Sequence, residues 1–473
     1  MNPATRSSRG PKKQNTLSLP FPSQRGGFLA ARGGKRGSRV VALAPPVMYL
    51  GTHIRRVACR HFFERQLLKQ RKRSGAPGAM IVAYLAAISA IAWMGAVMYT
   101  PALPLIAEEL QASRASIQFT MTAFMLTFAV AQLAYGPLSD RFGRRGALLT
   151  SFVLYIGGSV AVALSPDVTF FTLARVVQAA GGVGALVIAR AMVADLFDGD
   201  RVRRILAIVN SGASVAPVVA LAGGGFTIAV LGWRGIFWLS AGISFAFLIL
   251  TLLFLKETHT KRDPALYGGH RLIQNLWTLL TTPAFLIYTI APALIGGTIF
   301  GFLTGSPFVL IETLHVSTNT FGFIVALLPV GYIIGALVAI SLPSTLGTSP
   351  QIIGGASIST AFALILAILA LNDSLNVGAL TVCMMGFGFG AGLQLPSAMA
   401  AALGVRPELA GAASSLLGTI QMGVGGIASF LVGFFETGTG TGMVTVVFLM
   451  SFLGLLLAVL GAAVAPRLAA SVR

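Results

Sequence analysis

The sequence predicts an all-α membrane protein with twelve transmembrane helices in two six-helix halves. The first reason is composition, since only 10% of the 473 residues are charged and 55% are hydrophobic, and the mean hydropathy is +0.82. Soluble domains carry about 25% charged residues, so lipid must cover much of this apolar surface. The second reason is a series of long apolar stretches, and the third is a polar, basic loop that divides them six and six.

A basic N-terminal arm, residues 1–79, precedes the first apolar stretch. It holds 17 Lys/Arg and one acid, Glu64, a net charge of +16, whereas residues 80–473 hold 17 Lys/Arg and 13 Asp/Glu, a net charge of +4. Its Arg-, Gly-, Pro- and Ser-rich composition predicts disorder. We prefer the interpretation that translation begins at Met80. A basic surface helix over residues 55–73 and an organelle transit peptide are alternatives. We expect no nucleic-acid partner, because no fold accompanies the charge.

Twelve stretches are long enough to cross the bilayer, whose apolar core of about 30 Å needs roughly 20 residues of helix. Inside them the only charged residues are Arg175 and Arg190. The predicted spans are 80–102, 116–138, 146–165, 168–194, 205–231, 235–255, 283–311, 321–343, 351–372, 375–401, 409–435 and 442–464.

The orientation follows from the basic residues of the short loops, which favour the cytoplasm. With the N-terminus inside, the inner loops and tail hold thirteen Lys/Arg, and the outer loops hold only Arg114 and Arg234. We therefore expect a multi-pass protein of the cell inner (plasma) membrane with both termini cytoplasmic.

The loop after the second span carries an acid, three arginines and two glycines at fixed spacing: Gly136, Asp140, Arg141, Gly143, Arg144 and Arg145. We expect the glycines to permit a tight turn. Asp140 offers a carboxylate to a helix N-terminus or a cation, and the arginines can bridge carboxylates. A topology signal alone is the simpler interpretation, but it needs neither the acid nor fixed glycines.

Other candidate residues lie in and beside the spans of the first half. Arg175 lies about two turns inside the fourth span, with Gln178 one turn later, and a charge at that depth predicts function. Snorkelling to the surface is the alternative for Arg175. The remaining candidates are Arg190, Asp195, Tyr99, Pro101 in the first span, and Pro217 in the fifth.

These motifs resemble those of the major facilitator superfamily, whose signature the 136–145 loop matches at every defining position. The motifs of residues 80–260 resemble in particular the Bcr/CflA drug:proton antiporters. The resemblance implies that the loop clamps two halves and opens during alternating access. It also implies that Arg175 takes part in proton coupling.

Two positions depart from the relatives. Val97 stands where they usually carry Asp, Leu221 stands where they often carry a second Pro, and no Asp or Glu lies inside any span. Buried acids are the usual proton carriers in such pumps. The remaining candidates are Glu312, Glu108, Glu109 and Asp195, each of which is alternatively a solvated carboxylate at a loop end.

The loop 256–282 is predicted to be a cytoplasmic linker between a half at 80–255 and a half at 283–465, with a tail at 466–473. A faint repeat supports the division, because Glu-Leu-Gln-Ala-Ser at 109–113 resembles Thr-Leu-His-Val-Ser at 313–317. Paired halves hold substrate near the midplane in transporters. We expect a functional monomer, since one chain contains both halves.

The residues predict a transporter rather than an enzyme. Two cysteines and five scattered histidines form no metal site or catalytic constellation, and we expect no cofactor. The nearly uncharged spans favour an amphipathic small-molecule substrate, with the lipid bilayer and protons as further partners. With the resemblance, this predicts a secondary active transporter that exports amphipathic small molecules or drugs across the inner membrane by alternating access, coupled to protons. The alternatives are a facilitator or metabolite carrier without proton coupling and a non-transporting receptor or scaffold.

Overall fold

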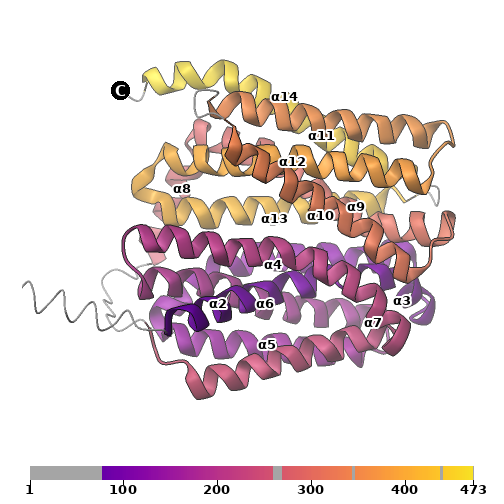
Figure 1. Cartoon of the computed structure of the whole chain (residues 1–473), viewed down its shortest axis with the longest axis horizontal. Coiled ribbons are helices and arrows are strands. Elements are labelled where there is room, and N and C mark those ends of the chain that lie inside the picture. The colour runs from indigo at the N-terminus through magenta and orange to yellow at the C-terminus, as the bar shows by residue number, and fades with distance from the viewer. Residues whose placement is uncertain (1–76, 259–268, 343–346, 437–439, 472–473) are drawn as a thin grey trace, which may run out of the picture. The chain divides into compact units, whose positions relative to one another are not determined.

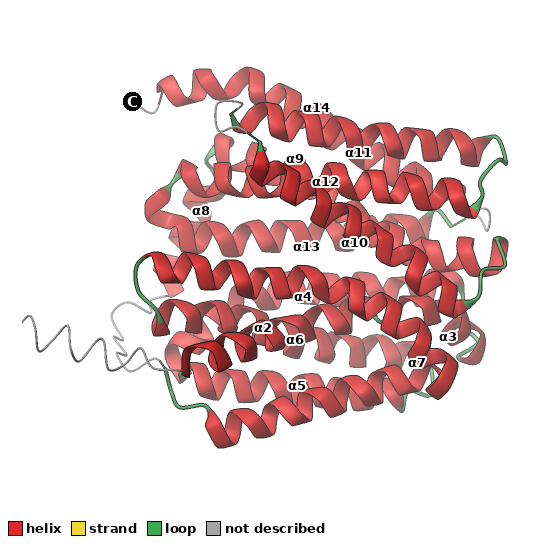
Figure 2. Cartoon of the chain, viewed as in Figure 1, coloured by secondary structure: helices red, strands yellow, loops and turns green. Residues whose placement is uncertain are grey.

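The computed structural model describes residues 77–258, 269–342, 347–436 and 440–471, and within these ranges the chain forms helices without strands (Figure 2). Eleven of the described helices are long and apolar enough to cross a membrane. The predicted all-α membrane fold is therefore confirmed. Most of the predicted N-terminal arm and residues 259–268 of the predicted linker lie outside the described residues.

The difference between eleven helices and twelve predicted spans lies in α7 (Asp200–Phe254), which has 55 residues. A straight helix of that length would measure about 80 Å, far more than the roughly 30 Å of a bilayer core. The backbone leaves helical geometry at Gly232, with φ 67° and ψ 178°, a conformation that is accessible essentially to glycine alone. The fifth and sixth predicted spans therefore meet at Gly232.

The first half begins with α2 (Pro77–Val97), a short turn η1 (Thr100–Ala102) and α3 (Leu103–Glu109). Pro101 lacks an N–H, and the Thr100 hydroxyl donates instead to the Val97 carbonyl at 2.9 Å. The first span is thus broken at Pro101, which is one of the candidate residues named from the sequence. The half continues with α4 (Arg114–Phe142), α5 (Arg144–Ala163), α6 (Val168–Leu196) and α7.

The second half contains six spans and one unpredicted helix, α8 (Gly269–Leu280), inside the segment that we expected to be a loop. Leu276 and Leu279 of α8 pack with Phe285 and Leu416. A twelve-residue helix that is apolar on one side is too short for a search for membrane spans. The spans are α9 (Pro283–Pro307) with the π-helical turn η3 (Phe308–Thr313), α10 (Thr318–Ser341), α11 (Thr348–Leu371), α12 (Val377–Val405), α13 (Ala410–Phe434) after the turn η5 (Pro407–Leu409), and α14 (Thr441–Ser471).

The caps of corresponding helices repeat between the halves. The Ser113 side chain accepts from Ser116 N at the start of α4, and Ser317 accepts from Thr320 N at the start of α10. Asp167 and Asn376 likewise cap α6 and α12. Such caps satisfy N–H groups that the first helical turn leaves free. The repeat seen in the sequence therefore recurs in local structure at the second and fourth spans of each half.

The two halves, indigo to magenta and orange to yellow in Figure 1, meet mainly along two helix pairs, α4 with α13 and α7 with α10. Small residues allow the close approach, as is common in membranes. A Cβ added to Gly322 of α10 would lie 2.4 Å from the Leu221 carbonyl oxygen of α7. Between α4 and α13, Gln132 Nε2 donates to Ser415 O at 3.2 Å, and the Thr419 hydroxyl donates to Ala129 O at 3.1 Å.

Candidate functional site

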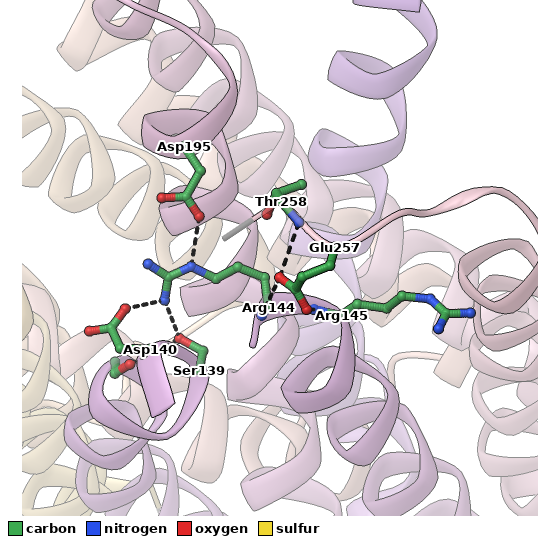
Figure 3. A network of polar contacts seen from close by, with 8 residues as sticks. Ser139, Asp140, Arg144, Arg145, Asp195, Glu257 and Thr258 are labelled. Carbon is green, nitrogen blue, oxygen red and sulfur yellow. Dashed lines mark hydrogen bonds and ion pairs between the residues drawn. The ribbon is translucent and has the colours of Figure 1, made fainter. Parts of the chain in front are cut away.

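Two clusters of charge lie at opposite ends of the bundle. We call the end that holds Gly143 the inner end and the opposite end, which holds Ser113, the outer end, following the orientation expected from the sequence. At the inner end, six residues form what we call the inner network (Figure 3): Ser139, Asp140, Arg144, Arg145, Asp195 and Glu257.

Arg144 is the centre of the inner network. Its side chain is only 8% exposed; it forms an ion pair with Asp140 of α4, and its Nε donates to Asp195 of α6 at 2.8 Å. Its guanidinium also donates to the Ser139 hydroxyl at 2.6 Å. Charge-assisted bonds of this kind are stronger than neutral ones. Arg144 therefore ties α4 and α6 to the start of α5.

Glu257, which follows α7, completes the inner network from the other side. Its carboxylate accepts the backbone N–H groups of Arg144 at 2.9 Å and of Arg145 at 3.2 Å. These are the first residues of α5, whose preceding residue, Gly143, has no side chain to cap them. A carboxylate is also favoured by the positive end of the helix dipole. Glu257 thus supplies the missing cap and fixes the end of α7 to α5.

The loop residues that were predicted to clamp the two halves lie in different surroundings. Asp140, Arg144 and Arg145 lie in the inner network, whereas Arg141 is exposed and lies over the Phe142 ring at 5.3 Å. Gly143 forms the turn with φ 90°, as expected. The expectation for Gly136 was wrong: it lies within α4, because the helix continues to Phe142. The two ion-pair partners of Arg144, Asp140 and Asp195, both belong to the first half.

Arg175 of α6 is fully buried near the middle of the first half. Its guanidinium donates to the Gly95 carbonyl of α2 and to Gln178 Oε1, both at 2.6 Å. The rings of Tyr99 and Phe124 each lie 4.1 Å from the guanidinium carbon, a cation–π arrangement. Arg175, Gln178 and Tyr99, all predicted, therefore come together in one cluster.

This cluster contains no carboxylate among the described residues. Gln178 extends the hydrogen-bonded cluster to α5, since its Nε2 donates to the Ser159 hydroxyl at 2.8 Å. Two nitrogens of Arg175, Nε and one terminal nitrogen, are buried without an acceptor in the described part of the chain. A buried cation held only by neutral acceptors and rings is costly, which favours a functional role over snorkelling.

At the outer end, four residues form what we call the outer cluster: Arg114, Gln118, Glu312 and Glu436. Arg114 begins α4, and it forms an ion pair with Glu312 of η3 and a second one, at 3.4 Å, with Glu436 after α13. Gln118, one turn along α4, also donates to Glu436 at 3.4 Å. The outer cluster therefore joins the first half to the second.

Another ion pair at the outer end stays within the first half. Glu109 at the end of α3 pairs with Arg234 and accepts from the Trp233 indole N–H, both just after the Gly232 corner of α7. The two arginines expected outside, Arg114 and Arg234, thus each find carboxylates. Only Arg114 finds them across the boundary between halves.

The other predicted pathway residues are scattered. Arg190 Nε donates to Asn210 Oδ1 of α7 at 3.2 Å. Asp195 belongs to the inner network, Glu312 belongs to the outer cluster, and Pro217 lies within α7. The sequence reasoning did not identify the roles of Arg114, Glu436 and Glu257. The rarity of Lys/Arg in the outer loops was a signal for Arg114, whereas nothing in the local sequence marked the two acids.

Comparisons with known proteins show which family the sequence resembles. The model of the Major Facilitator Superfamily matches residues 85–430. The chain is 31% identical over 366 residues to an uncharacterized MFS-type transporter, YdgK, of Bacillus subtilis, covering 76% of this chain and 89% of that one. It is 27% identical over 361 residues to the bicyclomycin resistance protein homolog of Haemophilus influenzae, covering 76% and 90%. It is 29% identical over 330 residues to the multidrug resistance protein MdtL of Escherichia coli, covering 69% and 81%.

Solved structures share the fold at low identity. A peptide transporter POT in complex with sulfate superposes with a TM-score of 0.67 at 16% identity, covering 83% of this chain and 94% of that one. A bacterial homolog of the human lysosomal transporter Spinster, in an inward-facing and unoccupied conformation, gives 0.65 at 14% identity, covering 82% and 96%. At this identity the likeness concerns the fold alone.

Proposed function

Because the chain belongs to the Major Facilitator Superfamily, we propose that it is a secondary active transporter of the inner membrane. It exports small amphipathic molecules by alternating access between its two halves. Both termini lie in the cytoplasm, and the monomer is the functional unit. The proposal for the direction and class of substrate rests on the similarity to a bicyclomycin resistance protein homolog and to the multidrug resistance protein MdtL.

The observation that supports alternating access is the set of ion pairs that joins the two halves at the outer end. At the outer end, Arg114 joins the halves through Glu312 and Glu436. At the inner end, Arg144 pairs with Asp140 and Asp195 of its own half. Ion pairs that join the halves at the outer end are what a state closed to the outside requires. Breaking the outer cluster would let the outer ends part while the inner network keeps the first half rigid.

The chemistry of the spans supports an amphipathic substrate. Within the described spans, carboxylates occur only near the ends, as with Glu109, Asp140 and Glu312. The interior offers neutral amides and aromatic rings, with Arg175 buried and Arg190 bonded to an amide. A multiply charged substrate would leave its charges unpaired at high cost. An uncharged or weakly charged molecule with one apolar side avoids that cost.

Proton coupling is part of the proposal, with the outer carboxylates as its carriers. Glu312 and Glu436 both form ion pairs with Arg114, so protonating one of them would weaken the contact between halves. An interior carboxylate is absent from the described spans, and position 97 is valine. This observation favours the second candidate, a facilitator or metabolite carrier without proton coupling.

Transport into inverted vesicles tests the proposal. The full chain would be expressed in cells that lack their own pumps, and uptake of chloramphenicol, bicyclomycin and a fluorescent dye would be followed with and without a protonophore. Uptake that stops with the protonophore supports a proton-driven exporter. Uptake that persists down a substrate gradient supports the facilitator. No flux of any probe, with the protein present in the membrane, contradicts drug export.

A further inference from the structure

An aromatic contact joins the two halves near the middle of the bundle. Trp93 of α2 stacks on Phe300 of α9, with ring centroids 6.2 Å apart and ring planes 9° from parallel. Phe128 of α4 lies beside the indole at 6.3 Å and 39°. Trp93 is partly exposed as a residue, while its ring lies against Phe300 of the second half.

The position of this contact is central in both spans. Trp93 lies about midway between Gly78 and Glu109, and Phe300 about midway between Pro283 and Thr313. Phe300 precedes Glu312 by twelve residues, about 18 Å along a helix. The rings therefore lie well inward of the outer cluster, at the depth where paired halves hold their substrate.

The indole N–H of Trp93 has no acceptor. Its Nε1 is buried without a hydrogen-bond partner in the described part of the chain. The indole of Trp233, by contrast, has a hydrogen-bond acceptor, since its Nε1 donates to Glu109. Buried polar groups without partners are rare, and each one calls for an explanation. A hydrogen-bond acceptor on a bound molecule would explain the unpaired Nε1 of Trp93.

A second unused polar group lies one helical turn inward of Phe300. Gly296 of α9 approaches Gln421 of α13 so closely that an added Cβ would lie 3.1 Å from Gln421 Nε2. Gln421 is partly exposed, and its amide makes no hydrogen bond to any residue that the structure describes. A flat aromatic surface, an indole donor and a free amide thus come together, contributed by both halves.

We propose that Trp93 and Gln421 bind the planar, uncharged part of the transported molecule, which displaces Phe300 from the indole. The ligand is an aromatic or conjugated ring that carries a carbonyl or similar acceptor. Its ring stacks on Trp93, its acceptor takes the Nε1 proton in a hydrogen bond, and Gln421 contacts a second polar group. This assignment rests on the proposed function and names its substrate class.

The stack also links binding to the movement of the halves. A ring that stacks on the indole competes with Phe300 for the same face, and so weakens a contact between α2 and α9. A ligand shifts a conformational equilibrium only through such differential contacts. An aromatic ligand would therefore favour separation of the halves at this level, whereas a saturated molecule of equal size would not.

The test compares Trp93→Phe with Trp277→Phe in the full chain. Trp93→Phe keeps an aromatic ring but removes the donor, whereas Trp277 lies exposed on α8 and serves as the matched control. Chloramphenicol is the aromatic probe with amide and nitro acceptors, and bicyclomycin is the non-aromatic one. The measurements are the KM for vesicle uptake and the quenching of tryptophan fluorescence in purified protein.

We expect Trp93→Phe to raise the KM for chloramphenicol about fivefold to tenfold, the usual effect of one lost hydrogen bond. It should leave the KM for bicyclomycin unchanged and abolish saturable quenching. Trp277→Phe should retain the parental KM and quenching. An unchanged KM and persistent quenching in Trp93→Phe, with the parent active, would overturn this inference and leave the proposed function standing. A parent that moves neither probe contradicts the proposed function itself.

Discussion

At the scale of single residues, the Arg144 side chain forms ion pairs with Asp140 and Asp195 and donates a hydrogen bond to Ser139. Because its side chain is only 8% exposed, removing it would leave Asp140 and Asp195 facing each other without their cation. Breaking a buried pair from one side is costly, since the remaining charge keeps its desolvation penalty. Arg144 is therefore the residue of the loop motif on which the first half depends most.

We predict that Arg144→Met destabilises the protein by about 2 kcal/mol or more and lowers the apparent melting temperature in detergent. Arg141→Ala is the matched control. It removes an arginine of the same motif that contacts the Phe142 ring and should leave melting unchanged. Equal melting temperatures for the two variants would contradict the role given to Arg144.

We predict that Arg175→Lys reduces vesicle transport at least tenfold while the protein remains folded. The ammonium is a point charge without the planar guanidinium, so it loses the flat cation whose central carbon lies 4.1 Å from the Tyr99 and Phe124 rings. Arg175→Gln, which removes the charge, should be at least as defective. Full transport by Arg175→Gln would show that the cation is not needed.

How far the sequence could predict these residues depended on separation along the chain. Asp140 and Arg144 are four residues apart, and Gly143 lies between them in the same motif, so local pattern was enough. Glu257 lies 113 residues from Arg144, and Glu436 lies 322 residues from Arg114. Such pairs depend on how the helices are arranged, and a single sequence does not carry that information.

At the scale of helices, most of the fold followed from apolar length. The predicted spans correspond to α2 through α7 and α9 through α14, because a bilayer demands about 20 apolar residues wherever a helix crosses it. The exception was α8, which is too short to span a bilayer and is stabilised by packing onto Phe285 and Leu416. Its helical structure depends on tertiary contacts, which hydropathy does not report.

Glycine contacts differ according to whether they lie between halves or within one. We predict that Gly322→Ala, whose Cβ would lie 2.4 Å from Leu221 O of the other half, shifts the protein toward an outward-open state. Gly388→Ala, whose Cβ would lie 2.2 Å from Leu328 O of the same half, should instead lower stability, because no movement of the halves relieves the clash.

Two measurements separate these outcomes: the apparent melting temperature, and the reactivity of a cysteine at Thr122 toward an impermeant thiol reagent. Thr122 is buried in α4 one turn inward of Gln118, and Cys59 and Cys383 would first be replaced by alanine. Gly223→Ala, which meets nothing within 4 Å, is the control for both. Similar behaviour of Gly322→Ala and Gly388→Ala would contradict the distinction.

At the scale of the whole molecule, the ion pairs of the outer end provide a direct test of alternating access. We predict that Arg114→Ala increases outside labelling of Thr122→Cys about tenfold, because it removes the ion pairs with Glu312 and Glu436 that join the halves. Arg234→Ala removes a similarly exposed ion pair that stays within the first half and should leave labelling unchanged. Labelling that rises equally in both variants would mean that loss of outer charge, rather than release of the halves, exposes the site.

The outer cluster also makes the protein responsive to its surroundings. The side chains of Arg114 and Glu312 are 37% and 34% exposed, so dissolved ions can reach and screen them. The screening length falls from about 8 Å in physiological salt to about 3 Å in molar salt. Arg144, almost completely covered, is shielded from this effect. In the proposed orientation, a saline medium would loosen the closed state from outside, and fresh water would hold it shut. The resting balance of the transporter would then track the salinity of the habitat.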